Sequence, residues 1–556
     1  MSILIDPRGD LQWETIPGLV EDAAARFGET EALVDAYGPN GTTIRLTFDR
    51  LAEDVAAASR ALIANGIERG DRVAIWAPNS AAWVVAALGA VGAGAVLVPL
   101  NTRFKGQEAA YILQSSGARI LFTVRGFLGI DYPALLAAAV ADGDALPDLE
   151  RVVLLSGGSG GDDTESTRQR RGDPVVPWAD FVQEGTGIGE DVAAGRTASI
   201  ASDDPCDLIY TSGTTGRPKG VMNTHSQTLR SFATWAEVTG LDKGDRYLII
   251  NPFFHTFGYK AGVLTCLMRG ATIVAEPVFD VDTVRARIAQ EHISVLPGPP
   301  TIYQSILSHP DRTGAELSSL RLAVLGASVI PVELVQRMQS ELGIETVLTA
   351  YGLTEATGVV TMCRRGDSVE TIAGTSGRAI PDVEVEVVDA DGHEVPRGDT
   401  GEIVVRGYTL MTGYWHAPAG TEEAIDADGW LHTGDVGTMD DQGNISITDR
   451  LKDMYVTGGF NAYPAEIEAV LRGYPGVDQV AVIGVPDDRM GEVGCAYVVV
   501  APDTSVDDVV AGLAEWSRDR MANYKVPRVV KVVDALPFNA AGKVLKRELR
   551  QLFAAG

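Results

Sequence analysis

The stretch YTSGTTGRPKGV, residues 210–221, decides how the rest of the chain is interpreted. It follows an apolar run and combines three glycines, four serine and threonine hydroxyls and Lys219. Glycine lets a backbone approach a ligand closely, and N–H groups, hydroxyls and a lysine together attract an anion. The pattern predicts a phosphate-binding loop between a strand and a helix that begins near His225, with a flexible surface turn as the alternative. It is not a Walker loop, because the Gly-Lys-Ser/Thr spacing is missing.

Apolar strands and helices alternate on both sides of this loop. Helical stretches such as VDTVRARIAQEH (281–292) and PVELVQRMQSEL (331–342) separate the strands. This alternation predicts an α/β fold with parallel sheets covered by helices, in which ligands bind beyond the carboxyl ends of the strands. The expected strands are residues 119–124, 151–155, 247–251, 271–276, 294–298, 320–326 and 345–352.

Residues 73–102 carry no charged side chain, so a membrane-spanning helix has to be considered. Glycines and prolines, among them Pro78, Gly94 and Pro99, interrupt the run where turns between shorter elements belong. The local patterns predict a strand in RVAIWA, a helix in NSAAWVVAALGAVGA and a second strand in AVLVPL. We therefore expect a buried strand–helix–strand unit and no integral membrane segment.

The length of 556 residues predicts at least two domains. From about residue 381 to 449 the pattern changes to short alternating strands, which indicates a small β-rich subdomain. Residues 450–556 then form a compact α+β unit, so the expected domains are 1–449 and 450–556. The polar stretch 156–174 is typical of an exposed, mobile insertion, with a regulatory segment as the alternative.

Composition excludes several classes of partner. The chain holds 46 Lys+Arg and 75 Asp+Glu, a net charge of −29. So acidic a protein is a poor candidate for binding nucleic acid or anionic membrane surfaces, because the negatively charged phosphates of both would repel it. The four cysteines lie far apart without a CxxC pair, which indicates neither a zinc site nor a redox pair. No secretory signal is visible at the start, and a reduced cytoplasm is the expected location.

The stretch at 210–221 resembles the phosphate loop of the acyl-adenylate-forming superfamily, which includes acyl-CoA synthetases, coumarate ligases and peptide-synthetase adenylation domains. Further motifs follow in the family's order over nearly the whole chain. The resemblance implies ATP as a substrate and assigns the loop residues to it. These are Thr211, Ser212, Gly213, Thr214, Thr215, Gly216 and Lys219.

The stretch TAYGLTEATG (349–358) is similar to the family's adenine and magnesium motif. By this resemblance, Tyr351 and Gly352 meet the adenine and Thr354 the α-phosphate, while Glu355 binds Mg²⁺ together with Thr211. Mg²⁺ ordinarily takes one or two carboxylates plus phosphate oxygens, which agrees with this assignment. Two other motifs, LGAS (325–328) and GWLHTGDVG (429–437), resemble the adenine-side wall and the ribose site. They contribute Gly326, Ala327, Ser328 and Asp435.

The C-terminal region resembles the family's small mobile lid domain. Arg450 matches an arginine that contacts ribose and phosphate, and Lys452 occupies the hinge position. The loop Gly458, Gly459 and Phe460 matches the one that faces the pantetheine tunnel after the lid rotates. The stretch LPFNAAGKVLKREL (536–549) matches the motif that carries the adenylation lysine, here Lys543.

The implied activity is that of an AMP-forming acyl-CoA synthetase using ATP, Mg²⁺ and CoA. His255 matches the position beside the acyl carboxylate, and the small or apolar residues around it imply an apolar acid. The motifs at 351–367 and 448–468 are similar to those of ligases for a steroid-derived indane-dione propanoate. Medium- or long-chain fatty acids, a carrier-protein thiol as acceptor, and an inactive scaffold on the same fold are the alternatives. A homodimer is compatible with this class.

Overall fold

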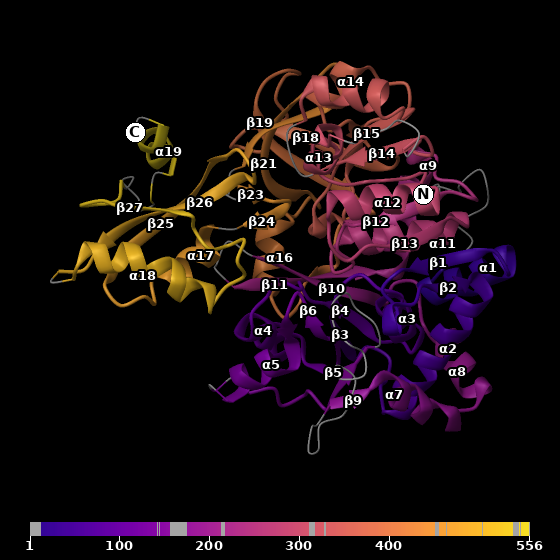
Figure 1. The fold of residues 1–556 in the computed structure, drawn as a ribbon. Helices are drawn as coiled ribbons and strands as arrows, with labels where there is room; N and C mark the ends of the chain where they lie inside the picture. The colour runs from indigo at the N-terminus through magenta and orange to yellow at the C-terminus, as the bar shows by residue number, and fades with distance from the viewer. Residues whose placement is uncertain are drawn as a thin grey trace.

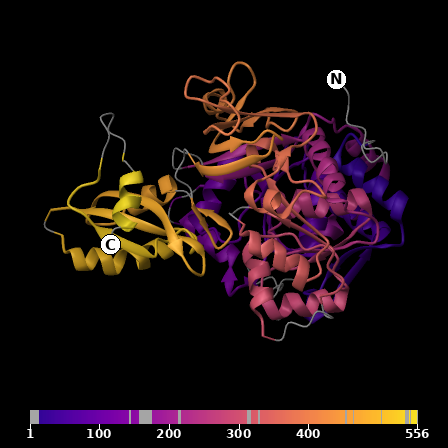
Figure 2. The ribbon, with the colours of Figure 1, turned by 90° about the horizontal axis from the view of Figure 1, so that it is seen from above.

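A computed structural model provides the structure. It describes residues 13–141, 143, 145–155, 175–212, 217–310, 317–326, 330–450, 455–462, 464–502, 504–537, 544 and 546–554. A large N-terminal domain and a small C-terminal domain lie side by side (Figures 1 and 2). The predicted insertion at 156–174 lies outside the described residues. The predicted boundary between residues 449 and 450 falls at the end of β22 (Ile445–Arg450) and stays a prediction, because residues 451–454 are not described.

The first sheet of the large domain is mostly parallel, which confirms the predicted α/β class. Among the described strands of this sheet, the antiparallel pairs are β10–β11 and β11–β20. In spatial order, the described strands are β20 (Gly413–Tyr414), β11 (Pro218–Thr224), β10 (Pro205–Ser212), β4 (Val96–Pro99), β3 (Arg72–Trp76), β5 (Ala118–Thr123), β8 (Arg151–Leu154) and β9 (Val175–Pro177).

The uncharged stretch 73–102 forms the predicted buried strand–helix–strand unit, β3–α3–β4, with α3 spanning Ala81–Gly92. Ser80 caps the helix by accepting a hydrogen bond from the N–H of Trp83 at 3.2 Å. Glycine is required where α3 crosses α2 (Phe48–Ala64), because a Cβ on Gly89 would lie 2.5 Å from Ala58 Cβ. The run is apolar because α3 packs between a sheet and another helix. No described helix is long and apolar enough to cross a membrane.

Two smaller sheets complete the core of the large domain. Residues 294–298, predicted as a strand, make only isolated parallel bridges that join β12 to β14, through Tyr247, Val295 and Leu322. The strands, in spatial order, are β12 (Arg246–Ile249), β13 (Thr272–Ala275), β1 (Glu31–Asp35) and β2 (Ile44–Thr47) in one sheet, and β14 (Leu322–Leu325), β15 (Thr346–Tyr351), β16 (Thr361–Met362) and β17 (Arg378–Ala379) in the other.

Helices cover these sheets (Figure 1). Besides α2 and α3, the described α-helices of the large domain with at least six residues are α1 (Ile16–Phe27), α4 (Gly106–Ser116), α5 (Tyr132–Ala141), α7 (Trp178–Glu184), α8 (Glu190–Ala198), α9 (His225–Thr239), α12 (Val281–Glu291), α13 (Pro300–Ser308), α14 (Val332–Glu341), α15 (Val369–Gly374) and α16 (Pro418–Ala424). A six-residue π-helix, η3 (Tyr259–Leu264), follows the turn that carries His255.

Residues 383–450 contain an antiparallel sheet of β18 (Val383–Val388), β19 (Gly401–Gly407), β21 (Leu431–Met439) and β22. The C-terminal domain has a sheet and apolar core of its own. Its elements are β23 (Tyr455–Thr457), β24 (Phe460–Ala462), α17 (Pro464–Leu471), β25 (Val477–Asp487), β26 (Gly491–Val500), α18 (Val506–Arg518), β27 (Val529–Val532) and α19 (Lys546–Ala554).

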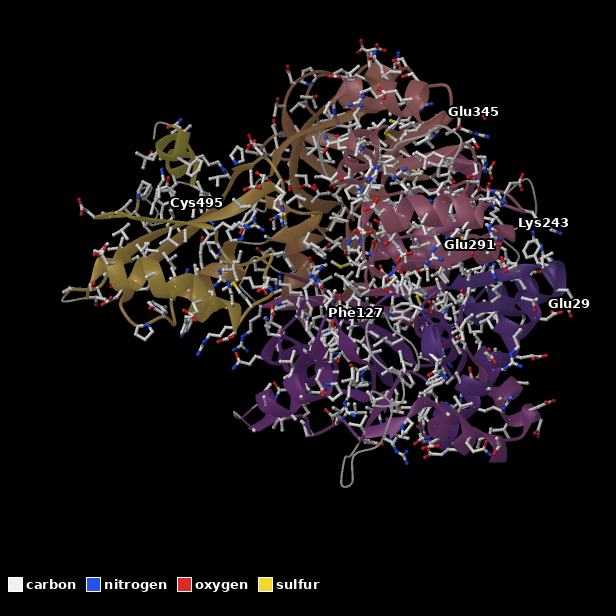
Figure 3. All side chains as sticks on the ribbon, viewed as in Figure 1. Glu29, Phe127, Lys243, Glu291, Glu345 and Cys495 are labelled. Atoms are coloured by element: carbon white, nitrogen blue, oxygen red, sulfur yellow. The ribbon has the colours of Figure 1, made fainter. Side chains whose placement is uncertain are left out.

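Charged side chains such as Glu29, Lys243 and Glu345 lie at the periphery of the large domain (Figure 3). Cys495, labelled in the C-terminal domain, is one of four cysteines that are all free and buried.

Candidate active site

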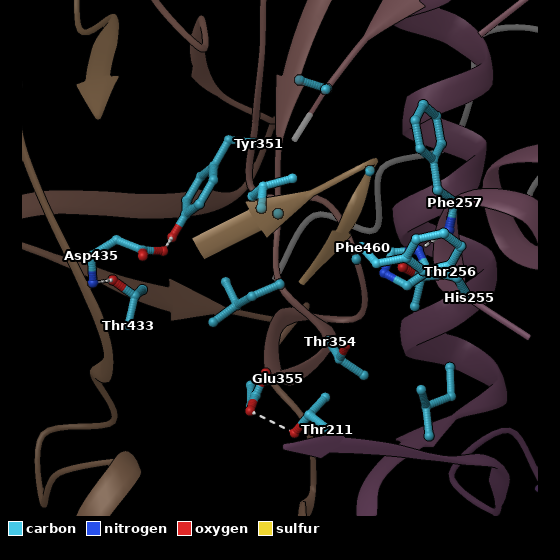
Figure 4. Close-up of a pocket in the computed structure, with 18 of the residues that line it drawn as sticks. Thr211, His255, Thr256, Phe257, Tyr351, Thr354, Glu355, Thr433, Asp435 and Phe460 are labelled. Carbon is cyan, nitrogen blue, oxygen red and sulfur yellow. Dashed lines mark hydrogen bonds between the residues drawn. The ribbon is translucent and has the colours of Figure 1, made fainter. Parts of the chain in front are cut away.

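A cavity of about 1160 Å³ opens between the two domains. Side chains from the ends of β10 and β15 line it, together with residues from the turn after β12, from β21 and from the β23–β24 hairpin (Figure 4). Five residues predicted from four separate motifs, Thr211, His255, Tyr351, Glu355 and Asp435, meet here. As expected for a fold with parallel sheets, the cavity collects residues that follow strand ends.

The strands on either side of the predicted phosphate loop, β10 and β11, pair in antiparallel fashion. Residues 218–224 form β11, a strand that the sequence did not predict, with Thr211 opposite Lys219. The predicted helix near His225 is confirmed, because α9 begins at His225. Helix α9 begins only after β11, capped by Thr224, which accepts a hydrogen bond from the N–H of Gln227 at 3.3 Å. No described helix therefore begins directly after the loop, and the anion-binding role of the loop residues stays a prediction. Gly213, Thr214, Thr215 and Gly216, and the side chain of Ser212, lie outside the described residues.

Glu355 lies beside the strand that precedes this loop. Its Oε1 accepts hydrogen bonds from the Thr211 hydroxyl at 3.3 Å and the Tyr414 hydroxyl at 2.9 Å. Lys219 Nζ lies 4.8 Å from the centre of the Tyr414 ring, so a cation, an aromatic ring and a carboxylate form one cluster. Sequence reasoning missed Tyr414, because its only signal is an aromatic residue in the short stretch GYW at 413–415.

The backbone around Glu355 is held by contacts that only glycine permits. Glu355 lies in a short 3₁₀ turn, η4 (Thr354–Ala356), at the end of β15. A Cβ on Gly352 would lie 2.3 Å from the carbonyl oxygen of Gly358, so a side chain has no room there. The buried Thr354 follows directly and lines the cavity. The TAYGLTEATG motif thus folds into a tight loop that fixes Thr354 and Glu355 at the cavity.

Tyr351 and Asp435 lie at the end of the cavity opposite His255 (Figure 4). The Tyr351 hydroxyl donates a hydrogen bond of 2.6 Å to Asp435 Oδ2, and both side chains are buried. Arg450 lies opposite Asp435 in the β21–β22 register, although its side chain is not described. The two motifs assigned to adenine and ribose are therefore in direct contact.

His255 marks the apolar part of the cavity. Its ring faces the cavity, and its Nδ1 accepts a hydrogen bond from the N–H of Phe257 at 3.2 Å. The surrounding protein lowers the pKa of His255 to about 4, although the side chain is exposed at the cavity surface. Phe257 packs edge-on against Trp235 at 5.7 Å. The remaining apolar lining of this part is Phe232, Phe254, Ala261, Leu325 and Ile330.

Gly326 follows β14 and lines the same part of the cavity. Ala327 and Ser328, assigned with it to the adenine-side wall, lie outside the described residues, and so do Lys452 and Lys543. Their roles stay predictions.

The C-terminal domain closes one side of the cavity with the β23–β24 hairpin. Gly458 and Gly459 form its turn with φ of +57° and +83°, in the region that favours glycine. Phe460 follows and lines the cavity, with its ring stacked on Tyr524 at 4.8 Å. The predicted loop at 458–460 therefore does reach the cavity.

Residues 20–415 match the family described as AMP-binding enzyme, and residues 466–543 match the AMP-binding enzyme C-terminal domain. The chain belongs to the AMP-binding enzyme family. Two relatives, from Rhodococcus jostii and Mycobacterium tuberculosis, are named as 7a-methyl-1,5-dioxo-octahydro-1H-inden-4-yl propanoyl:CoA ligases. Each is 50% identical, over 97% of this chain and 98% or 99% of the relative. The predicted class, an AMP-forming acid–thiol ligase that uses ATP and CoA, is confirmed.

Solved structures agree with the two-domain fold. An o-succinylbenzoate CoA synthetase from Bacillus subtilis, bound to its product analogue, is 27% identical with a TM-score of 0.77, covering 96% of this chain and 98% of its own. ATP-bound MatB from Rhodopseudomonas palustris is 29% identical with a TM-score of 0.64, covering 97% and 99%. The two structures are about equally identical to this chain in sequence, but the higher TM-score shows that its fold superposes better on the o-succinylbenzoate CoA synthetase than on MatB.

Proposed function

We propose that this chain activates an apolar bicyclic carboxylic acid with ATP and transfers the acyl group to CoA. The observation that carries the proposal is the shared cavity. Thr211, Glu355 and Asp435 lie on its nucleotide side, while His255 and Trp235 lie in its apolar part. The hairpin with Phe460 reaches the same space from the C-terminal domain.

In the first step, a carboxylate oxygen of the acid attacks the α-phosphorus of ATP, and pyrophosphate leaves. Both reactants are anions, so catalysis depends on positioning and on charge stabilisation rather than on proton transfer. Lys219 supplies positive charge beside the loop, and Thr354 faces the reacting phosphate. Asp435 is suited to accept hydrogen bonds from the ribose hydroxyls, in exchange for the one it now accepts from Tyr351.

Glu355 and Thr211 suit Mg²⁺, because together they present only oxygen atoms at the cavity edge. When bound there with phosphate oxygens, the ion would neutralise part of the triphosphate charge. The Tyr414 hydroxyl, which donates to the same carboxylate oxygen, keeps Glu355 oriented toward Thr211.

In the second step, the sulfur of CoA attacks the acyl carbonyl carbon, AMP leaves, and the thiol proton goes to solvent. No negative charge then builds on a phosphate beyond that of the leaving AMP, so Lys543 is not needed. We propose that the chain pivots at residues 450–452, which moves Lys543 away and the Phe460 hairpin into place. The higher TM-score with the synthetase bound to its CoA product analogue than with ATP-bound MatB supports the proposal that the two domains of this chain lie in the orientation for the second step.

We propose the steroid-derived indane-dione propanoate as the acid. The two relatives that are 50% identical over nearly the full length are named for that acid, whereas a human medium-chain acyl-CoA ligase is 32% identical. A neutral His255 and aromatic walls suit an apolar ring system. We also place the reaction in the reduced cytoplasm, because the four cysteines are free.

A panel of acids assayed by AMP release tests this choice. We expect kcat/KM for the bicyclic propanoate to exceed that for decanoate or ferulate about tenfold or more, a difference of about 1.4 kcal/mol. A rigid ring system loses less conformational freedom on binding than a flexible chain, which favours it in a preformed pocket.

The variant Trp235→Ala should lower kcat/KM for the bicyclic acid and leave the KM for ATP unchanged, because Trp235 lies on the acid side. Trp178→Ala is the matched control, since Trp178 packs on Phe122 and Phe181 and does not line the cavity. A preference for decanoate over the bicyclic acid would contradict the assignment and favour the fatty-acid alternative.

A further inference from the structure

A buried lysine connects the two domains. The Lys525 side chain, in the C-terminal domain, is only 3% exposed, and its Nζ contacts two carboxylates. Glu108 Oε1, on α4 of the large domain, lies 2.6 Å away, and Glu466 Oε1, on α17 of the C-terminal domain, lies 2.5 Å away. One cation therefore bridges a carboxylate from each domain.

Both carboxylates lie in the first turn of a helix, where the helix dipole favours negative charge. Glu108 also accepts a hydrogen bond from the N–H of Lys105 at 2.9 Å, so it caps α4 while it contacts the lysine. Burial by itself lowers the pKa of Lys525, but Tyr524, Glu108 and Glu466 outweigh it and the net pKa lies well above the usual value. Lys525 therefore stays charged.

The bridge lies next to the hairpin that reaches the cavity, and Lys525 and Glu466 also line that cavity. Lys525 Nζ lies 4.7 Å from the Phe104 ring of the large domain, and its neighbour Tyr524 stacks on Phe460. The Arg103 guanidinium of the large domain lies 5.7 Å from the centre of the Phe460 ring. The ion bridge and the position of Phe460 thus belong to one packed interface.

Charge burial makes this interface specific for one orientation. A buried ion pair adds little net stability, but separating one partner from the other is costly, so such pairs select a particular arrangement. Lys525 and Glu466 move together because both belong to the C-terminal domain. Glu108 stays behind whenever that domain rotates, and it is therefore the partner that distinguishes this orientation from others.

We propose that Lys525 is a positioning residue for the thioester-forming step, because its bridge to Glu108 holds the C-terminal domain where Phe460 faces the cavity. This inference rests on the proposed two-step function. Lys525 acts through the placement of the hairpin and not through contact with the reacting atoms. The adenylation step, which needs the domain in another orientation, does not depend on the bridge.

The test uses Glu108→Gln in the full-length protein, with the two half-reactions measured separately. Glutamine keeps the helix cap, because either Glu or Gln serves at that position, but it removes the charge that Lys525 contacts. We expect transfer from chemically made acyl-AMP to CoA to fall tenfold or more. Acid-dependent ATP–pyrophosphate exchange should stay within twofold. Lys525→Met should have the same two effects. Transfer to CoA should fall tenfold or more, and ATP–pyrophosphate exchange should stay within twofold of the parent rate.

The matched control is Glu468→Gln. Glu468 lies on the same helix as Glu466, but it pairs with Lys546 of its own domain at 2.7 Å. This variant should leave both half-reactions within twofold. Equal losses in both half-reactions for Glu108→Gln, or an unchanged transfer rate, would overturn the proposal. A raised KM for CoA in Lys525→Met but not in Glu108→Gln would also overturn it, because Lys525 would then contact CoA.

A distance measurement separates this inference from the proposed function. Spin labels on cysteines at Val140 and Val510, both exposed and on different domains, report the domain orientation without any reaction. We expect one dominant distance in the parent and a second population in Glu108→Gln. If the distance distribution is unchanged, the bridge does not hold the domain. If no acid supports AMP release by the parent, the proposed function fails whatever the distances show.

Discussion

Replacing Lys543 with alanine should slow acid-, ATP- and CoA-dependent thioester formation about 100-fold or more. Negative charge builds on the α-phosphate as the carboxylate attacks, and a single preorganised donor to such charge is worth about 10²–10³ in rate. The measurement is steady-state formation of acyl-CoA at saturating substrates. Because the structure does not describe Lys543, this expectation comes from the family motif that carries it and from the chemistry of the first step.

The same variant should transfer the acyl group from chemically made acyl-AMP to CoA at nearly the parent rate. Lys546→Ala, which removes a nearby lysine that pairs with Glu468, is the matched control and should leave the overall rate within a few-fold. If Lys543 only supports the fold, both half-reactions of Lys543→Ala fall together and the variant melts earlier. Equal losses with unchanged melting would contradict a rotating domain and leave one lysine serving both steps.

Replacing Glu355 with glutamine should lower kcat/KM for ATP about 10- to 100-fold, because a contact to a charged group is worth about 1.5–3 kcal/mol. The substitution removes the carboxylate that we propose for Mg²⁺, and extra Mg²⁺ should restore part of the rate. The measurement is the initial rate over a range of ATP and Mg²⁺ concentrations.

Tyr414→Phe is the matched control for Glu355. It removes the hydroxyl that donates to Glu355 and keeps the carboxylate charge, so its effect should be much smaller. A Glu355→Gln protein within twofold of the parent at saturating Mg²⁺ would show that the metal role assigned to Glu355 is wrong.

The buried strands and helices could be predicted from sequence where a long apolar run is interrupted by glycines and prolines at the turns. Residues 73–102 show this, because Pro78, Gly94 and Pro99 separate two strands from a helix. Strand β11 was missed because its residues 218–224 begin with the Pro-Lys-Gly of the loop motif and end at a helix cap. A strand of seven residues between a loop motif and a helix cap is too short to show a clear alternation of apolar and polar residues.

The site residues were predictable because each motif follows a strand end, and the fold gathers such ends. Thr211, Glu355 and Asp435 come together for this reason. Their individual roles came from the family resemblance, since spacing alone does not tell a magnesium ligand from a ribose acceptor. Tyr414 and Lys525 were missed because their partners are remote, with Glu108 lying 417 residues from Lys525.

The central claim is that the chain forms an acyl adenylate and then an acyl-CoA. Product analysis of one reaction with the bicyclic propanoate, ATP, Mg²⁺ and CoA tests it most directly. We predict one AMP and one pyrophosphate for each acyl-CoA formed, and acyl-AMP with pyrophosphate when CoA is left out. Release of ADP and orthophosphate would contradict the account, because those products require attack at the γ-phosphorus.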